Sequence, residues 1–566
     1  MKSRLLGLLA LICFLSLFLF MGESHFHTRG EPREALVAVA MLQDGNWTLP
    51  ITNGTDIAYK PPLFHWAIAA VSSVIGKVTE YTSRMPSAIA LTAMILTGFL
   101  FYARQRGTEL AFLASLITLS NFEVHRAGMN CRVDMLLSAL MVLALYQLYK
   151  WYEKKLRGIP WWAILCLSGA FLTKGPVGLI LPCIVVALFA WIRGMNFFRI
   201  LFSFAGVAIA ACLLPALWYI AAWRQGGDRF LALVIEENVL RFLGKMTYAS
   251  HENPWYYNVM TITMGFVPYS LLLLISLFTL KYTRFSIGIK EGWRQLVKRI
   301  REMDDTRLFS LLSIVIMFVF YCIPKSKRSV YLLPVYPFIA YFIAEYVIWL
   351  VKHKSQSVKC FNGILCVFGI VLTVIFAIVR MGWIPDSFLG GKAANLAYLH
   401  ALETLPLGMN LIPILLPVAV AILYFRSKNG GNRRLMYGGV AMTFALFFAL
   451  DGVYQPTVLN VKSNKSIAER VKALVPEGNI YSYVTFTIKH NRMHPFTLNY
   501  YLDNRVVPFV DFAPTEGYLF IDEKEYDGFM ENYGNAFFIE ELPDSRFKSN
   551  DNREWMHIYH FKKKQS

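Results

Sequence analysis

The sequence has few cysteines and no pattern that would use them together. Eight cysteines are spread over 566 residues, most of them in or at the ends of apolar runs. There is no C-x-x-C pair, and the last two hundred residues contain no cysteine at all. We therefore expect neither a disulfide framework nor a structural zinc site.

Acidic residues are also scarce. Only 37 Asp and Glu stand against 56 Lys and Arg, which leaves a net charge of +19. Such an excess can indicate nucleic-acid binding, but here the basic residues are scattered through short loops between apolar runs. The preference of membrane proteins for positive cytoplasmic loops explains this pattern more simply, so we expect no nucleic-acid partner.

Apolar runs dominate the rest of the chain. The composition is 56% hydrophobic and 15% aromatic, and about a dozen runs approach the roughly 20 residues that cross a bilayer. The pattern predicts a polytopic α-helical membrane protein with about 13 transmembrane helices. We expect residues 1–452 to form a transmembrane catalytic domain and residues 453–566 to form a soluble α/β domain outside the cytoplasm.

The first hundred residues set the topology. The run from Leu5 to Met21 resembles a signal peptide, but no good cleavage site follows it, so we interpret it as an uncleaved first helix. A first outer loop is then expected at 23–85. Within it, the segment 61–76 is short and opens with two prolines, which favours an interfacial helix over a span.

The later spans alternate from this loop onward. We expect crossings at 86–103, 108–122, 135–151, 160–173, 176–192, 200–222, 255–279, 308–323, 329–351, 360–380, 408–425 and 435–451. This order puts the basic loop 281–307 in the cytoplasm and the C-terminal domain outside. We therefore expect a multi-pass protein of the bacterial inner membrane whose active site faces the periplasm.

The C-terminal residues have a mixed, β-rich pattern. A helix is predicted at 466–474 and strands are predicted at 480–484, 505–510, 518–521, 536–539 and 556–561. No catalytic constellation is visible in this part, so its simplest role is that of a lid or a brace.

Charged residues gather on the predicted outer face. Glu31 and Asp134 are candidate catalytic residues, because a carboxylate can take a proton from an acceptor or orient it. Lysine and arginine can neutralise phosphate oxygens. The candidate substrate-binding residues are Lys60, Lys174, Lys325, Lys327 and Arg328, with their neighbours Arg33, Glu34 and Tyr331.

Each main candidate also has a simpler explanation. Glu31 and Asp134 could simply cap or stabilise the N-termini of the helices that begin at these positions. Lys60 could be a snorkelling interface lysine, and Lys174 a plain loop residue. These alternatives stay open at the level of sequence.

Seven short motifs occur in an order that resembles a known family. They are EPREA (31–35), GNWTLP (45–50), KPPLFHW (60–66), RMPSA (84–88), RVDM (132–135), FLTKGP (171–176) and YLLP (331–334). Over essentially the whole chain, this order is similar to that of the bacterial aminoarabinose transferases and protein mannosyltransferases. Those proteins are membrane glycosyltransferases that use polyprenyl-phosphate sugars.

The resemblance implies an inverting sugar transfer from a polyprenyl-phosphate donor to a lipid, glycan or protein acceptor, as in lipid A modification or protein glycosylation. A carboxylate of the first outer loop would activate the acceptor. The family usually has Asp-Glu where this chain has Gly30 and Glu31, so the resemblance gives that role to Glu31.

The resemblance leaves the cofactor open. The family's Glu-Lys-Pro is Tyr59, Lys60 and Pro61 here, so one carboxylate is missing. No cofactor is certain. A divalent metal is a candidate, with His65 and His251 as weak candidate ligands, because an interfacial histidine is more often polar packing.

Two other classes compete with a glycosyltransferase. A lipid or solute transporter is the alternative, and a non-catalytic polyprenyl-lipid binding protein is the third. A transporter should carry charges within spans at matched positions of two halves, whereas here the charges concentrate at one face. A pure binding protein should be unaffected by loss of Glu31.

Overall fold

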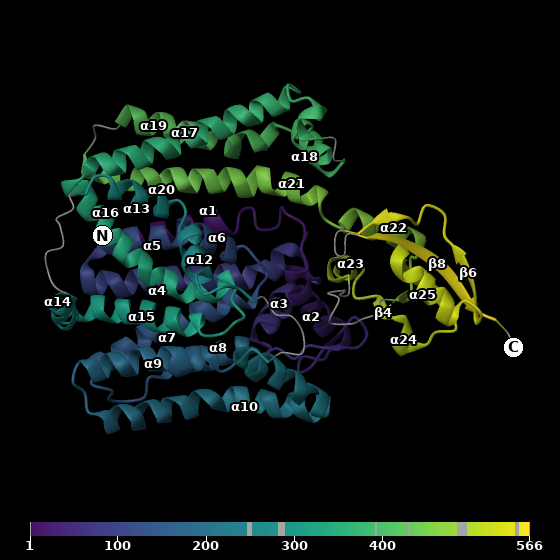
Figure 1. Ribbon diagram of the computed structural model, residues 1–566, viewed down its shortest axis with the longest axis horizontal. Helices are drawn as coiled ribbons and strands as arrows, with labels where there is room; N and C mark the ends of the chain where they lie inside the picture. Colours follow the sequence, from purple (N-terminus) through teal and green to yellow (C-terminus); the bar gives the residue numbers. More distant parts are fainter. Residues whose placement is uncertain are drawn as a thin grey trace.

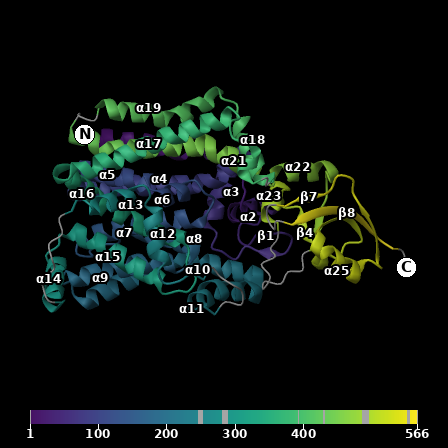
Figure 2. The same cartoon turned by 45° about the horizontal axis from the view of Figure 1, so that its top comes forward.

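The computed structural model describes residues 2–245, 252–280, 289–390, 393–427, 431–483, 495–549 and 554–564. Most helices run side by side in one bundle, and a small sheet lies beyond one end of it (Figure 1). In both ribbon views α2 and α3 lie between the bundle and the sheet (Figures 1 and 2). The expected fold class, a polytopic helical membrane protein with a C-terminal region that contains a sheet, is confirmed.

Within the described residues, eight continuous helical segments are long and apolar enough to cross a membrane. They are Glu80–Arg106 (α4), Val133–Glu153 (α7), Phe197–Leu240 (α10 with η1), Asp305–Cys322 (α15), Ser329–His353 (η2 with α16), Ser355–Arg380 (α17), Gly408–Ser427 (η4 with α19) and Asn432–Val461 (α20, η5 and α21). A ninth would be bent, because α12 (Tyr257–Gly265) and α13 (Tyr269–Leu277) meet at 101°.

Three more of the expected spans are shorter apolar helices, α5 (Thr108–Ser120), α8 (Trp161–Lys174) and α9 (Val177–Ile192), and the first expected span corresponds to α1 (Lys2–Leu17). The helix α3 (Leu63–Ile75), expected at the interface, is also short and apolar. At 1.5 Å per residue even the 16 residues of α9 reach only about 24 Å, less than the roughly 30 Å hydrocarbon core. The number of thirteen crossings therefore stays a prediction.

Burial explains why a helix as short as α5 is apolar all round. Every residue from Leu110 to Ser120 is buried inside the bundle, so α5 packs against protein on all sides. Its neighbour α4 begins with a capping box between Thr79 and Thr82 and ends with Arg104 and Arg106. Positive charges at this position interact favourably with the negative C-terminal end of the helix dipole.

The remaining helices include two that depart from the sequence expectation. Residues 30–44 form α2 (Gly30–Asp44), longer than the helical pattern of apolar residues at 35–42, and α10 (Phe197–Ile235) runs well past 222. A break at Gly227, where φ is +57°, bends α10 without ending it. The others are α1 (Lys2–Leu17), α6 (Phe122–Gly128), η1 (Glu236–Leu240), α11 (Arg241–Leu243), α14 (Ile289–Arg301), α18 (Ala393–Glu403) and η5 (Leu450–Tyr454).

The C-terminal sheet matches the predicted strands closely. Its order is β4-β3-β5-β8-β6, with β7 also paired to β8; β3 lies parallel to β4 and β5, and β8 is antiparallel to its neighbours. The strands are β3 (Ile480–Ser482), β4 (Val506–Pro508), β5 (Glu516–Asp522), β6 (Phe537–Glu541), β7 (Phe547–Lys548) and β8 (Trp555–Lys563). The helices are α22 (Lys465–Leu474), α23 (Phe496–Tyr501), α24 (Phe509–Phe512) and α25 (Glu523–Tyr533). Residue 484 of the first predicted strand lies outside the described residues.

Polar contacts join this C-terminal region to the first outer loop. That loop contains a small antiparallel ribbon, β1 (Ile51–Thr52) with β2 (Asp56–Ile57). The Asn499 side chain donates to Asn53 Oδ1 at 2.6 Å, and the Tyr501 hydroxyl donates to Glu80 at 2.7 Å. Buried polar groups are stabilised only when they are paired, so these bonds fix α23 against the loop.

Candidate functional site

Glu34 is the centre of a charged cluster on the first outer loop. Its carboxylate is buried and accepts hydrogen bonds from Lys60 Nζ, from Arg33 Nη2 at 3.0 Å and from His65 Nε2 at 2.9 Å. Arg33 and Glu34 are consecutive on α2, whereas Lys60 and His65 flank the start of α3. One carboxylate thus holds two cations that come from separate segments.

The pKa values in this cluster depend on neighbouring charges, so a bound anion would change them. Burial alone would raise the pKa of Glu34, but the charges of Lys60 and Arg33 hold it well below its usual value. Burial and the neighbouring Arg33 lower the pKa of Lys60 to about 8, although Glu34 opposes them. The Lys60 side chain keeps 26% of its surface exposed, so it is not sealed inside the protein.

Glu31, a predicted catalytic residue, has both oxygens occupied. Oε1 accepts from Arg84 Nε at 2.8 Å and from the Cys131 backbone N–H at 2.9 Å, and Oε2 accepts from Arg84 Nη2 at 3.1 Å. Arg84 lowers the pKa of Glu31 against the effect of burial. None of these donors belongs to the first turn of α2, so the helix-start explanation does not describe Glu31 here.

Arg84 also ties this carboxylate to the chain before α2. Its Nη1 donates to the carbonyl oxygens of Met21 and Ser24, each at 2.7 Å. Both Arg84 and Glu31 are almost fully buried. The pair therefore joins α4, α2 and the end of the first apolar segment into one unit.

Asp134 lies in a more open arrangement. It stands in the first turn of α7, where Arg132 is the N-cap residue and makes no side-chain cap. Its Oδ1 accepts from Lys174 Nζ, at the last residue of α8. Within the described part of the chain, Oδ2 has no hydrogen-bond donor, so this oxygen can take a proton.

Lys174 connects Asp134 to the loop after α15. Its ammonium group lies 4.1 Å from the centre of the Tyr331 ring, a cation–π distance. The structure therefore brings Lys174, Asp134 and Tyr331 together, as the sequence analysis expected of residues on one face.

The three basic residues of the segment 325–328 have different environments. Lys327 is buried and donates to the Asn253 carbonyl oxygen at 3.3 Å, which turns it toward the backbone. Lys325 is exposed, and Arg328 is half-buried ahead of η2 (Ser329–Val335). The charge of Arg328 lowers the pKa of Asp134. Of the three basic residues in this segment, Arg328 is therefore the one with the largest electrostatic effect on that carboxylate.

Three site residues were missed by the sequence analysis. Arg84 was quoted only as part of a motif, Arg132 only as the start of another, and Glu237 not at all. Glu237 comes from η1, where it pairs with Arg241 at 2.7 Å and its charge acts on Arg33 and Lys60. An arginine at the start of an apolar run was a signal for Arg84, because a buried charge needs a partner.

The described residues do not form a metal site. No group of three His, Cys, Asp or Glu side chains gathers to hold an ion in this part of the chain. His65 contacts Glu34, whose oxygens already accept from Lys60 and Arg33. His251, the other weak candidate, lies outside the described residues. We derive no step through a metal.

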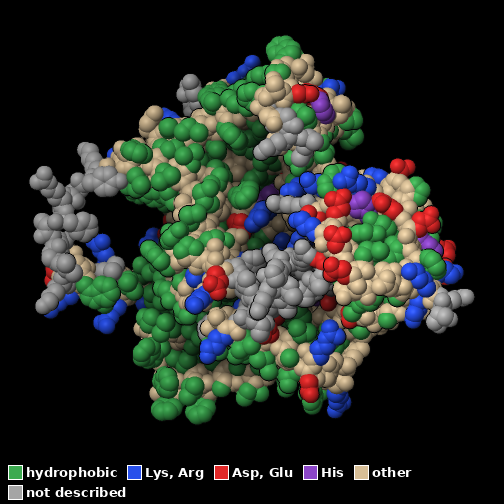
Figure 3. Space-filling model, turned by 45° about the vertical axis from the view of Figure 1, so that its right-hand side comes forward, with side chains coloured by type: hydrophobic (Ala, Val, Ile, Leu, Met, Phe, Trp, Pro, Cys, Tyr) green, Lys and Arg blue, Asp and Glu red, His purple; other side chains and the backbone are tan. Residues whose placement is uncertain are grey.

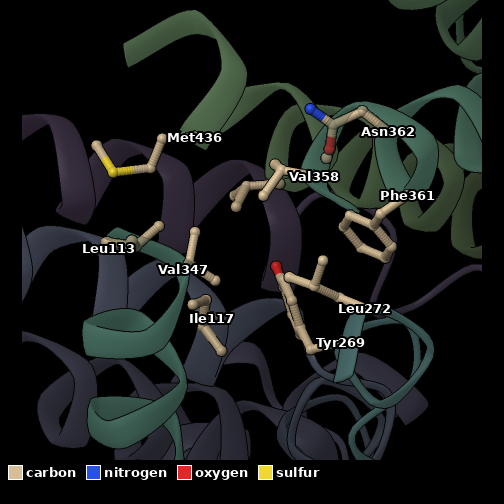
Figure 4. A pocket seen from close by; sticks show the side chains of 11 residues that line it. Leu113, Ile117, Tyr269, Leu272, Val347, Val358, Phe361, Asn362 and Met436 are labelled. Atoms are coloured by element: carbon tan, nitrogen blue, oxygen red, sulfur yellow. The ribbon is translucent and has the colours of Figure 1, made fainter. Parts of the chain in front are cut away.

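The surface is hollowed between the helical body and the C-terminal region. Figure 3 shows a recess between the helical body and the C-terminal region, with Lys, Arg, Asp and Glu side chains on its walls. A separate cavity of about 10 Å³ lies among apolar side chains of the bundle, including Ile117, Leu272 and Val358 (Figure 4). It holds roughly one water at most and has no charged lining, so the recess is the candidate site.

Comparisons with known sequences point to sugar transferases. Residues 59–219 match the family model described as dolichyl-phosphate-mannose-protein mannosyltransferase. The chain is 28% identical over 392 residues to an undecaprenyl phosphate-alpha-4-amino-4-deoxy-L-arabinose arabinosyl transferase of Proteus mirabilis, which covers 67% of this chain and 66% of that protein. It is 26% identical over 505 residues to an uncharacterized protein of Aquifex aeolicus, covering 88% and 87% of the two chains.

The fold is similar to that of ArnT from Cupriavidus metallidurans. The crystal structure of that protein bound to undecaprenyl phosphate aligns with a TM-score of 0.69 at 18% identity, over 98% of this chain and 97% of the other. Its apo structure aligns with a TM-score of 0.67 at 17% identity, over 99% and 98% of the chains. Motif order, matched model, relatives and shared fold thus agree that the chain is similar to the aminoarabinose transferases and protein mannosyltransferases, which are membrane glycosyltransferases.

Proposed function

We propose that this chain transfers a sugar from a polyprenyl-phosphate carrier to a lipid, glycan or protein acceptor, with inversion at the anomeric carbon. The observation that carries the proposal is the presence of two charged clusters linked by Arg132, which lies against Gly30 at the start of α2 and whose charge acts on Asp134. One cluster presents cations, Lys60 and Arg33, held by Glu34. The other presents a carboxylate, Asp134, whose Oδ2 has no donor among the described residues. Nothing in the comparisons supports the transporter alternative.

The two clusters can act on the two sides of the anomeric carbon in one substitution, one on the acceptor and the other on the leaving phosphate. Asp134 Oδ2 takes the proton from the acceptor's nucleophilic group as that group bonds to the anomeric carbon. The bond from this carbon to the phosphate oxygen breaks on the opposite side, and polyprenyl phosphate leaves with the electron pair. Lys60 and Arg33 stabilise the charge on the leaving phosphate, because fixed cations in a water-poor site act more strongly than solvent does.

The choice between the two candidate carboxylates follows from their contacts. Glu31 was the carboxylate favoured by the family resemblance, but Arg84 and the Cys131 N–H occupy both of its oxygens. A base needs an oxygen that can reach the acceptor's proton, and Oδ2 of Asp134 has no donor among the described residues. We therefore assign the proton transfer to Asp134 and the anchoring of the loop to Glu31.

We propose that the site faces the periplasm at the outer face of the bacterial inner membrane. The basic residues Arg104 and Arg106 at the end of α4 support this orientation, because positive charges favour the cytoplasmic side, and α2 and α3 precede the other end of α4. A carrier whose phosphate lies at headgroup depth would meet Lys60 at the start of α3.

Mass spectrometry of lipids and glycans from cells with and without the gene tests the function. We expect one acceptor to gain the mass of a single sugar residue only in cells with the gene. Cells that carry the Asp134→Asn variant should lack that product. Identical lipid and glycan profiles in all three strains would overturn the proposal.

A further inference from the structure

Arg132 fills space that most residues at position 30 would need. A Cβ built on Gly30 would overlap the guanidinium group of Arg132. Glycine at position 30 and arginine at position 132 therefore depend on each other. An arginine thus lies where the resemblance led us to expect an aspartate side chain.

The guanidinium group of Arg132 has no assigned partner. Across the described ranges it makes no hydrogen bond or ion pair, although its charge acts on both Glu31 and Asp134. The side chain is half-buried. A guanidinium has five N–H donors, so a half-buried one with no partner among the described residues is available to a ligand.

The position of Arg132 places it beside the sugar. It lies against Gly30, which is three residues, about one helical turn, before Arg33 on α2. It is also two residues before Asp134. In the proposed reaction the sugar lies between the base and the phosphate, hence between Asp134 and Arg33, and Arg132 lies near both, against Gly30 and with its charge acting on Asp134.

Among the described residues, each carboxylate named at this site already pairs with a cation. Glu31 is paired with Arg84, Glu34 is shared by Lys60 and Arg33, and Glu237 is paired with Arg241. Asp134 is paired with Lys174, and its second oxygen is assigned to the acceptor's proton. The charge that remains uncompensated here is therefore positive.

We propose that Arg132 determines which sugar is transferred: the carrier-bound sugar has no ammonium group, and amino sugars are rejected. This inference rests on the proposed function. It separates the chain from the Proteus mirabilis relative, whose name specifies a 4-amino sugar. A cation beside Arg132 would meet like-charge repulsion, whereas a hydroxyl or carboxylate would accept hydrogen bonds from it.

Two synthetic donors test the proposal with purified protein. Both have the same polyprenyl phosphate; one carries a neutral pentose and the other its 4-amino-4-deoxy derivative. A lipid extract of the host cells is the common acceptor source, and released polyprenyl phosphate gives kcat/KM. We expect a preference for the neutral donor on the order of a hundredfold at pH 7. Equal or better use of the amino donor would overturn the inference while leaving the proposed function intact.

Variants locate the effect at Arg132. Arg132→Gln should reduce the preference at least about tenfold, mainly by improving the amino donor, whereas Arg132→Lys keeps the charge and should keep the preference. Arg126→Gln is the matched control, because Arg126 lies on α6 and pairs with Glu123 at 2.9 Å. An unchanged preference in Arg132→Gln would refute the role. Transfer of neither donor by the wild type would instead refute the proposed function, and this inference with it.

Discussion

Arg84 donates to both carboxylate oxygens of Glu31, at 2.8 Å from Nε and 3.1 Å from Nη2, and both side chains are nearly inaccessible to solvent. A buried pair of this kind costs a great deal to break from one side, because the remaining charge is left without a partner. The pair thus explains how a loop rich in charge is held at the end of a membrane bundle.

We expect Glu31→Gln to destabilise the protein by roughly 3–5 kcal/mol, since it leaves the Arg84 guanidinium buried without its counter-charge. Thermal unfolding in detergent measures the loss. Asp503→Asn, which removes an exposed pair with Lys472 at 2.6 Å, is the control and should change stability by less than about 1 kcal/mol. A Glu31→Gln protein that is fully stable yet inactive would restore Glu31 as the base.

Asp134→Asn removes the only oxygen that we assign to the acceptor's proton. Turnover should fall by about 10²- to 10⁴-fold, while binding of undecaprenyl phosphate stays close to normal because Lys60 and Arg33 are unchanged. Rates of sugar transfer and a binding titration measure the two effects. Asp44→Asn, at an exposed position at the end of α2, should alter neither; near-normal turnover in Asp134→Asn would argue for another base.

Lys60→Ala should lower turnover about a hundredfold, because one fixed cation at the leaving phosphate is lost. Lys60→Arg should recover only part of the rate, since a planar guanidinium does not match the reach of an ammonium group. Lys77→Ala, an exposed lysine of the same outer loop, is the control for surface charge. If Arg fully restored a small loss, Lys60 would be only an interfacial lysine.

The pH dependence of kcat/KM should report the same lysine in the free enzyme. Its pKa of about 8 means that the cation is present below pH 8 and is lost as the pH rises further. Between pH 7 and pH 9, kcat/KM should therefore fall by about tenfold. In Lys60→Arg this fall should disappear, because arginine stays charged; an identical profile in both proteins would assign the titration to another group.

The topology predicts that both the first outer loop and the C-terminus face the periplasm. A reporter enzyme that is active only outside the cytoplasm should be active when fused after Ser566. The same reporter inserted after Arg106, in a basic turn expected inside, should be inactive. The opposite pair of results would reverse the orientation of the whole bundle.

Local patterns were enough to predict most of the fold. Strands such as β5 and β8 alternate or cluster their apolar residues over a few positions, and α22 follows a helical period over ten. These signals are contained within each segment. By contrast, α10 continues past residue 222 and through a break at Gly227. The apolar pattern of the sequence does not reveal this continuation.

The candidate site was predicted as a set of residues but not as a set of pairs. Lys60, Asp134 and Lys174 were singled out because charge beside a membrane needs a reason. Their partners come from other segments: Lys60 and Glu34 are 26 residues apart, and Lys174 and Asp134 are 40 apart. Only the tertiary fold decides how many donors each carboxylate has, so Glu31 and Asp134 could not be ranked from the sequence.

The bonds between Asn53 and Asn499 and between Glu80 and Tyr501 join residues more than 400 positions apart. A ribosome makes the first outer loop early and α23 near the end of synthesis. The loop that bears Lys60 and Glu34 therefore spends most of translation without its final neighbours. Catalytic competence must arrive only when the last part of the polypeptide has emerged and docked, so a prematurely terminated chain would insert into the membrane but remain inactive.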